Sequence, residues 1–203
     1  GSVYRFRTAL LVVCWFLGYS GIVYGPIGFA SLYLATQGYP ARTIFILGLI
    51  AVIGSVGGLL VSARLNERFD RRMVVLAGAV LTSLSLFMVF VAVHWLHNIV
   101  VLGIANTFVP AGIYLWLGNM YTYTAVAYPT SIRAIGTGWT DGFGHLGSMA
   151  SPLIIGPLFA ATAGAGYIGY FAYVIIPGAL LPGLLLARFG VDQRRVPLEA
   201  AAG

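Results

Sequence analysis

Six long apolar runs, separated by short polar stretches, make up almost the whole chain. A helix needs about 20 mostly apolar residues to cross the hydrocarbon core of a bilayer, and each run is long enough to do so. The pattern therefore predicts an all-α membrane protein with six transmembrane helices. These helices are expected at residues 8–34, 41–63, 73–95, 99–125, 134–161 and 168–188.

The composition also indicates a membrane environment. Of the 203 residues, 60% are hydrophobic and 8% are charged, whereas a soluble domain carries roughly 25% charged residues. No linker rich in serine and glycine divides the chain, so residues 1–189 are expected to form one six-helix unit. Residues 190–203 are polar enough to form a cytoplasmic tail. Within the first run, Gly25 and Pro26 predict a kink.

The basic residues are distributed unequally between the two sides of the predicted helices. All eleven are arginines, and only Arg42 falls on the side opposite the chain termini. Because cytoplasmic loops carry an excess of lysine and arginine, both termini are predicted to be cytoplasmic. The net charge of +6 does not indicate nucleic-acid binding, since the arginines lie at the ends of apolar runs and form no single patch. The ten on the predicted cytoplasmic side are Arg5, Arg7, Arg64, Arg68, Arg71, Arg72, Arg133, Arg188, Arg194 and Arg195.

Asp141 is the only acidic residue inside a predicted helix, and His145 follows it by four residues. This spacing places both on one helix face, which Thr137 and Ser148 extend. At 1.5 Å per residue, they lie about 12 Å and about 18 Å from Arg133 at the cytoplasmic edge. His145 is therefore expected near the middle of a core about 30 Å thick. An ionisable residue at this depth faces a cavity or a partner and indicates function, so we predict a proton-binding or substrate-binding site. The alternative is a polar staple between helices.

Other polar and aromatic side chains are weaker candidates for a substrate pocket, because each could equally pack between helices. They are Tyr19, Tyr24, Asn106, Trp116, Asn119 and Trp139. Residues 121–124, rich in tyrosine and threonine, are expected at the membrane interface. The third and sixth helices hold few polar groups, so they are predicted to be peripheral and to face lipid. The sequence contains no phosphate-binding loop, no metal-ligand spacing and no hydrolytic triad, which predicts a protein that is not an enzyme and has no cofactor or metal.

Three segments carry the motifs of a known family. Residues 63–72 read Ala-Arg-Leu-Asn-Glu-Arg-Phe-Asp-Arg-Arg and resemble the loop motif Gly-x-Leu-x-Asp-Arg-x-Gly-Arg-Arg of the major facilitator superfamily. Residues 125–139 resemble the segment Ala-Glu-x-Tyr-Pro-Thr-x-x-Arg-Ala-x-Gly-x-Gly of its sugar-porter and organic-acid symporter branches. Residues 191–199 are similar to the ending Pro-Glu-Thr-Lys-Gly-x-x-Leu-Glu of the same branches.

The resemblance implies the second half of a twelve-helix transporter, that is, half of a major-facilitator fold built as a 3+3 inverted repeat. In such a fold the substrate site lies between two halves that rock against each other. The expected partners are therefore the lipid bilayer, a small-molecule substrate, protons, and either a missing N-terminal half, as a separate or removed segment, or a second copy of the chain. The family also implies a cytoplasmic gate, here Glu67, Arg68, Asp70, Arg71, Arg72 and Arg133.

Two positions depart from the family pattern, because Val126 replaces its acidic residue and His145 replaces the arginine of a Gly-Arg-x-Gly segment. We predict the C-terminal half of a proton-coupled secondary transporter for a small polar organic solute, either an organic or aromatic acid or a sugar-like molecule. Its expected location is the inner (plasma) membrane. The alternative is a non-transporting membrane scaffold, or a remnant half-transporter that binds a partner. A small channel is disfavoured because no ring of charges or carbonyls repeats.

Overall fold

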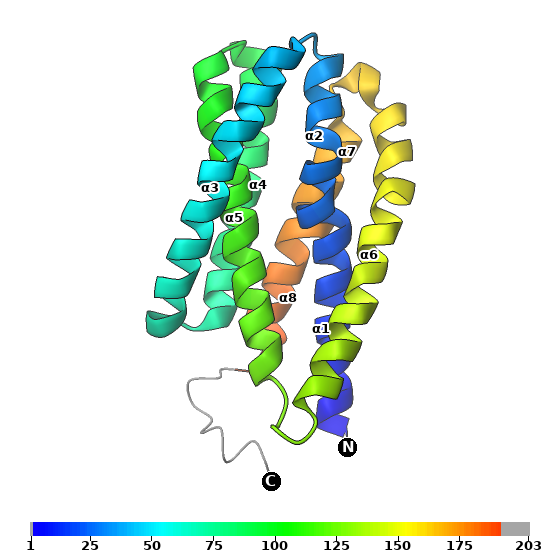
Figure 1. Cartoon of the computed structure of the whole chain (residues 1–203). Helices are drawn as coiled ribbons and strands as arrows, with labels where there is room; N and C mark the ends of the chain where they lie inside the picture. The colour runs from blue at the N-terminus through cyan, green and yellow to red at the C-terminus, as the bar shows by residue number, and fades with distance from the viewer. Residues whose placement is uncertain (1, 192–203) are drawn as a thin grey trace.

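The computed structural model describes residues 2–191 and confirms the six predicted helices (Figure 1). We number the membrane spans 1 to 6 in chain order. Spans 2, 4 and 5 are the continuous helices α3 (Ala41–Arg68), α5 (Ile99–Val126) and α6 (Arg133–Ala161). Span 1 consists of α1 (Ser2–Gly18), the π-helix η1 (Tyr19–Val23) and α2 (Tyr24–Thr36). Span 3 consists of α4 (Arg71–Val91) and the π-helix η2 (Ala92–Leu96). After the 3-10 turn η3 (Ala163–Ala165), span 6 consists of α7 (Ile168–Tyr173), the π-helix η4 (Val174–Leu180) and α8 (Leu181–Phe189).

Side-chain caps fix where α4 and α5 begin. Asp70 caps α4 by accepting a hydrogen bond from the Arg72 backbone N–H at 3.0 Å, and Asn98 caps α5 in the same way. Span 2 continues to Arg68, beyond the apolar run that predicted its end at residue 63. Arginine, leucine and glutamate are good helix formers, so the helix extends past the apolar segment into the polar loop.

The irregular turn of span 1 is the π-helix Tyr19–Val23, about one turn before Gly25 and Pro26, where the sequence predicts a kink. Pro26 has no backbone N–H, and its ring crowds the carbonyl four residues before it. The chain accommodates this with a wider π-turn, in which the Tyr24 N–H bonds the carbonyl of Tyr19. Within this π-turn the backbone of Gly21 packs directly on Gly178 of η4, so spans 1 and 6 cross in close contact.

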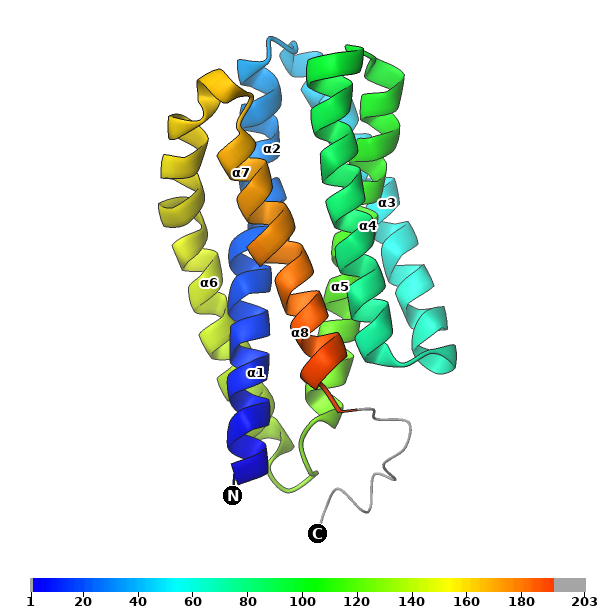
Figure 2. The same ribbon diagram turned by 180° about the vertical axis from the view of Figure 1, so that it is seen from behind.

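The six spans form two interlocked groups of three. Span 1 packs on spans 5 and 6, and span 4 packs on spans 2 and 3 (Figures 1 and 2). Spans 3 and 6 connect the groups through α4, η4 and α8. Spans 1, 2 and 3 correspond to spans 4, 5 and 6, so each span of one group has its equivalent in the other group, and a span and its equivalent run in opposite directions. This is the packing that a 3+3 inverted repeat produces.

Spans 2 and 5 are the least buried spans of this unit. Spans 3 and 6 are more buried within the unit than spans 2 and 5, because they meet through small residues. Each still exposes large apolar side chains, among them Leu84 and Leu184, and their lipid-facing position stays a prediction. Gly183 of span 6 lies against Ala79 of span 3, and Gly78 lies against the backbone of span 4.

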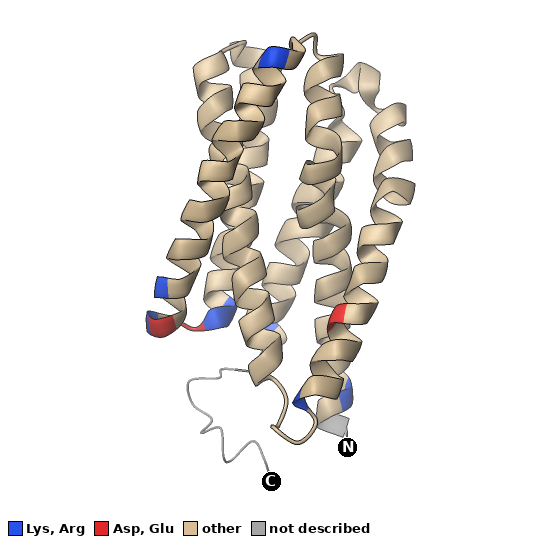
Figure 3. Ribbon diagram, viewed as in Figure 1, with Lys and Arg blue, Asp and Glu red and all other residues tan. Residues whose placement is uncertain are grey.

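Charged residues concentrate at one end of the bundle, where the chain begins (Figure 3). Span 6 ends at the same end (Figure 2). Arg42, at the start of α3, belongs to the opposite end. The structure thus separates Arg42 from the other described arginines, as the sequence predicts (Figure 3). That the arginine-rich end is cytoplasmic stays a prediction.

Candidate functional site

Tyr19, Tyr121 and Asp141 meet where spans 1, 4 and 5 come together. The Tyr19 hydroxyl donates a hydrogen bond to the Asp141 carboxylate at 3.1 Å and lies 2.5 Å from the hydroxyl of Tyr121. Tyr19 is 3% exposed, whereas the Asp141 side chain is 34% exposed. The carboxylate is thus held from the protein side by a fixed phenol while its other side is open.

His145 lies one turn further along α6, on the same face as Asp141, as their spacing predicts. Its Nδ1 is 2.9 Å from the backbone carbonyl of Asp141 and 3.5 Å from the carboxylate. Because a carbonyl only accepts, Nδ1 carries the proton in this hydrogen bond. The imidazole packs 4.4 Å from the Tyr19 ring, measured between centroids, and its side chain is 49% exposed. Within residues 2–191 no hydrogen bond reaches its Nε2, so this nitrogen is available to a ligand.

An aromatic layer supports these residues from the protein interior. Trp15 stacks on Tyr19 with centroids 5.1 Å apart, and Trp116 meets Trp15 edge-on at 5.7 Å. The Trp15 Nε1–H donates to the Thr124 hydroxyl at 2.9 Å, which joins span 1 to span 4. Both tryptophans are fully buried. They fix Tyr19 and do not themselves meet solvent.

Trp15 and Tyr121 are site residues that the sequence analysis missed. Trp15 precedes Tyr19 by four residues, and this spacing on one helix face is the signal that could have found it. Tyr121 was expected at the membrane interface, but its hydroxyl bonds Tyr19 inside the cluster. No pattern along the sequence indicated that span 4 would bring Tyr121 to span 1.

The structure brings Tyr24 to the edge of the cluster, but it places Asn106 and Asn119 elsewhere. Tyr24 is 38% exposed, and its ring lies 5.9 Å from that of Tyr19. Asn119 donates to the Ser62 hydroxyl at 2.9 Å, and Asn106 donates to a backbone carbonyl of α3 at 2.8 Å. Both asparagines therefore join span 4 to span 2. Asn106 also borders an apolar cavity of about 380 Å³ between spans 1, 2 and 4.

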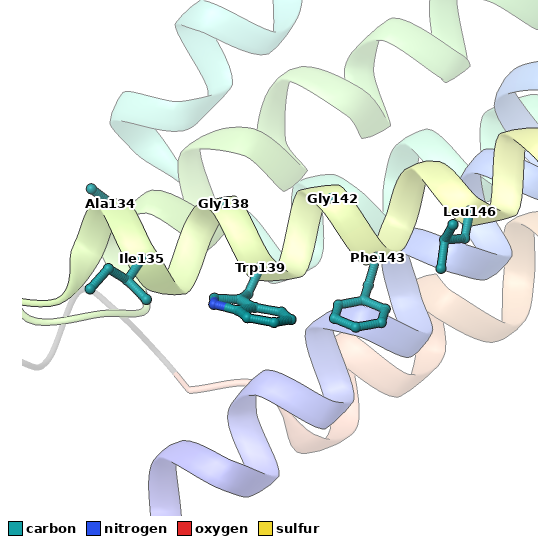
Figure 4. A pocket seen from close by; sticks show the side chains of 7 residues that line it. All are labelled: Ala134, Ile135, Gly138, Trp139, Gly142, Phe143 and Leu146. Carbon is teal, nitrogen blue, oxygen red and sulfur yellow. The ribbon is translucent and has the colours of Figure 1, made fainter.

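Trp139 lies on a different side of α6. It precedes Asp141 by two residues, which is a rotation of about 200° around the helix. Trp139 is 59% exposed and stacks on Phe143 at 5.3 Å. The two rings border a groove of about 490 Å³ whose floor is Gly138 and Gly142 (Figure 4). This groove is separate from the Asp141 cluster.

The two outer residues of the predicted polar stripe, Thr137 and Ser148, form hydrogen bonds to the backbone of their own helix. The Thr137 hydroxyl donates to the backbone carbonyl of Arg133 at 2.6 Å, and the Ser148 hydroxyl donates to that of His145 at 2.6 Å. Such bonds are common for hydroxyls inside helices. The chemistry of the stripe therefore lies with Asp141 and His145.

At the arginine-rich end, two of the predicted gate residues form a buried ion pair. Asp70, 5% exposed, pairs with the Arg72 guanidinium through Nε at 2.9 Å. Arg72 also donates from Nη1 to the Gly190 carbonyl at 2.7 Å, which ties the loop between spans 2 and 3 to the end of span 6. Glu67 and Arg68 are exposed in the last turn of α3, just before this loop. Arg133 begins α6 on the other group of spans.

The loop between spans 4 and 5 is anchored by Tyr128. Its hydroxyl lies 2.9 Å from the Thr8 hydroxyl of span 1, and its ring covers Gly136 at the start of α6. Burial raises the pKa of the Tyr128 phenol above its usual range. Tyr128 is therefore a neutral hydrogen-bonding group that fixes the start of the helix carrying Asp141.

The partial exposure of Asp141 and His145 limits what can lie against this face of α6. A carboxylate inside a membrane span is costly unless it faces water or a partner. Within residues 2–191 no arginine lies within ion-pairing distance of Asp141, and His145 is its only ion-pairing neighbour. The face that carries this pair must therefore border a water-filled cavity or another protein surface.

Comparison with known proteins identifies transporters as relatives. The chain is 32% identical over 161 residues to the niacin transporter NiaP of Acinetobacter baylyi, which covers 78% of this chain and 35% of the relative. It is 28% identical over 153 residues to a putative niacin/nicotinamide transporter NiaP of Bacillus subtilis, covering 75% of this chain and 37% of the relative. A gallate transporter of Pseudomonas putida is 28% identical over 206 residues, covering 98% of this chain and 43% of the relative. No protein-family model matches the chain.

The six spans make the chain a multi-pass integral membrane protein. The relatives are named as transporters and not as enzymes, in agreement with the sequence-based prediction, and bacterial relatives support a plasma-membrane location. The relatives are transporters of the major facilitator superfamily and cover most of this chain, which is consistent with one half of a transporter of that superfamily. The chain spans less than half the length of these relatives.

Proposed function

We propose that the chain is one half of a proton-coupled secondary transporter for a small polar organic solute. The observation that carries this proposal is the placement of Asp141 and His145. They are a carboxyl group and an imidazole in contact, partly exposed within a membrane span, and set against the rings of Tyr19, Tyr24 and Tyr121. Such pairs form proton relays and substrate sites in membrane transporters.

The names of the relatives narrow the solute class. Niacin and gallate are the solutes named for two of them, and both are small aromatic carboxylic acids. A site with aromatic walls and one titratable pair suits such a molecule, because the rings provide apolar contact and a few polar groups fix its orientation. Aromatic acids are therefore the first solutes to test for this protein.

A second six-helix unit completes the transporter in this proposal. It covers the face that carries Asp141 and His145, so that the solute lies between the two units. The start of α4 with Asp70 and Arg72, together with Arg133, closes the arginine-rich end as the cytoplasmic gate. The unit is either a different segment or a second copy of this chain.

Uptake into liposomes with the assembled transporter tests the function. With an inward proton gradient, we expect nicotinate or a hydroxylated benzoate to accumulate, and Asp141→Asn to abolish the gradient-driven part. The variant should still assemble, which size-exclusion chromatography in detergent checks. Unchanged gradient-driven uptake by Asp141→Asn would remove the proposed role of Asp141. Absence of solute-dependent uptake or stabilisation, with Asp141→Leu tolerated, would favour a scaffold that does not transport.

A further inference from the structure

We propose that His145 is the group that receives the solute's carboxylate, through Nε2, and that one proton enters the site with each anion. This assigns a monoanionic aromatic carboxylate as the solute form and distinguishes the roles of His145 and Asp141. The inference rests on the proposed function, since it concerns the same site.

The orientation of the imidazole is the first support. Nδ1 is occupied by the backbone carbonyl of Asp141 at 2.9 Å, and the ring is held 4.4 Å from that of Tyr19. A ring fixed by Nδ1 directs Nε2 away from its own helix backbone. Since the His145 side chain is 49% exposed, Nε2 can donate to an approaching carboxylate once it is protonated. The exposed ring of Tyr24, 5.9 Å from Tyr19, can pack against the solute ring.

The second support is the set of charges around the site. The groups that face His145 and Asp141 are the phenols of Tyr19 and Tyr121, with Tyr24 beside them. Phenols donate hydrogen bonds but carry no positive charge. Arg133 begins the same helix about 12 Å from Asp141. Within the described part of the chain, His145 is therefore the group at this site that can present a cation to an anion.

Charge balance then links the anion to a proton. Asp141 and His145 together hold one proton when the pair has zero net charge. Binding an anion would leave the site with one net negative charge, which is costly inside a membrane. Uptake of one further proton restores zero charge, and because the groups touch, they share this proton as a unit. Each anion therefore loads with one proton, and the loaded site is neutral.

Nicotinate and nicotinamide provide a matched pair of probes, because they differ in charge and little in shape. We would measure the affinity of the assembled, purified protein for each compound at several pH values between about 5.5 and about 8. Nicotinate affinity should fall by up to about tenfold for each rise of one pH unit, and nicotinamide affinity should stay flat and weaker. His145→Gln should lower nicotinate affinity at least about tenfold at the acidic end and remove the preference for the acid. A change of this size is about 1.4 kcal/mol.

Two further variants keep the test informative. His145→Arg retains a positive charge, so it should retain the preference for nicotinate over nicotinamide. Combined with Asp141→Asn, it leaves neither group of the pair to titrate, and nicotinate affinity should become independent of pH. His94→Gln changes a histidine at the opposite end of the spans, where it contacts Tyr33, and should bind both probes as the unchanged protein does.

The outcomes separate this inference from the proposed function. The protein could transport an aromatic acid or another solute while His145→Gln leaves both the preference for nicotinate and the pH dependence of its affinity unchanged. This result would overturn the inference about His145 and leave the proposed transport function standing. Equal, pH-independent affinity for the two probes in the unchanged protein would do the same. Binding and uptake of neither probe by a folded, assembled protein would overturn the aromatic-acid assignment itself.

Discussion

Asp141 depends on a residue from another span for its orientation. The buried phenol of Tyr19 donates to the carboxylate, and Tyr19 is itself fixed by Trp15 on one side and the Tyr121 hydroxyl on the other. A hydrogen bond to a carboxylate contributes more than one between neutral groups. The chemistry of the site therefore extends to residues that a solute need not touch.

Tyr19→Phe should impair coupling more mildly than Asp141→Asn. It removes the hydroxyl that bonds both Asp141 and Tyr121 and leaves the aromatic packing in place. The bond to Asp141 is the one that acts on coupling, so we expect gradient-driven uptake to fall about threefold to tenfold, in line with about 0.5–1.5 kcal/mol for one hydrogen bond. Initial uptake rates in liposomes measure this. Tyr33→Phe is the matched control, because it removes a hydroxyl of the same span that bonds His94 at 3.0 Å. Equal losses in both variants would show that the Tyr19 hydroxyl has no specific role.

Asp70 and Glu67 lie three residues apart but should differ in their effect on stability. Asp70→Ala removes both the cap of α4 and the buried partner of Arg72. We expect the free energy of unfolding to fall by about 1–3 kcal/mol, from loss of the cap and of the ion pair. Glu67→Ala, at an exposed position, should change it by less than about 0.5 kcal/mol. Unfolding in detergent measures both, and similar values for the two variants would contradict the structural role of Asp70.

At the scale of helices, the sequence predicted which segments exist better than it predicted how they meet. Each apolar run exceeds the length needed to cross a bilayer, so all six spans were found. The shared face of Asp141 and His145 follows from helix periodicity alone. The contact of Tyr121 with Tyr19 does not, because it depends on spans 1 and 4 being neighbours, and periodicity within one helix carries no information about its neighbours. The π-turn at Tyr19 was missed because its cause, Pro26, lies outside the turn itself.

The close crossing of α3 and α5 depends on individual glycines. A Cβ on Gly58 would collide with the backbone of Ala111 in α5, whereas a Cβ on the adjacent Gly57 would meet nothing within 4 Å. Gly58→Ala should therefore lower the free energy of unfolding by about 1–3 kcal/mol by forcing the helices apart. Gly57→Ala should leave it unchanged or raise it by up to about 1 kcal/mol, since alanine favours the helix. Thermal unfolding of both variants in one detergent compares them, and equal melting temperatures would contradict the tight crossing.

At the scale of the whole molecule, the two groups of spans leave spans 2 and 5 largely uncovered. Apolar side chains on these spans are compatible with lipid. Contact with lipid does not require glycines whose Cβ position is unobstructed. In membranes, small residues at four-residue spacing allow the backbones of two helices to approach closely. Gly138 and Gly142 have this spacing on α6, and the Cβ position of each is open. Trp139 and Phe143 border the same groove (Figure 4). These features favour a helix of the second six-helix unit as the occupant of this groove.

Gly142→Leu tests this pairing without disturbing the six-helix unit. Because nothing lies within 4 Å of its Cβ position, the variant should leave the stability of the unit unchanged or raise it by up to about 1 kcal/mol, since leucine favours the helix over glycine. It fills the groove, so association with the second unit and solute uptake should both be lost. Native mass spectrometry of the purified protein in mild detergent measures association and also distinguishes a second copy of this chain from a different one. Gly164→Leu, equally open but in the turn η3 between spans 5 and 6, should assemble normally. If Gly142→Leu assembles and transports as the unchanged protein does, the groove faces lipid and the second unit pairs elsewhere, with the exposed face of α3 as the next surface to test.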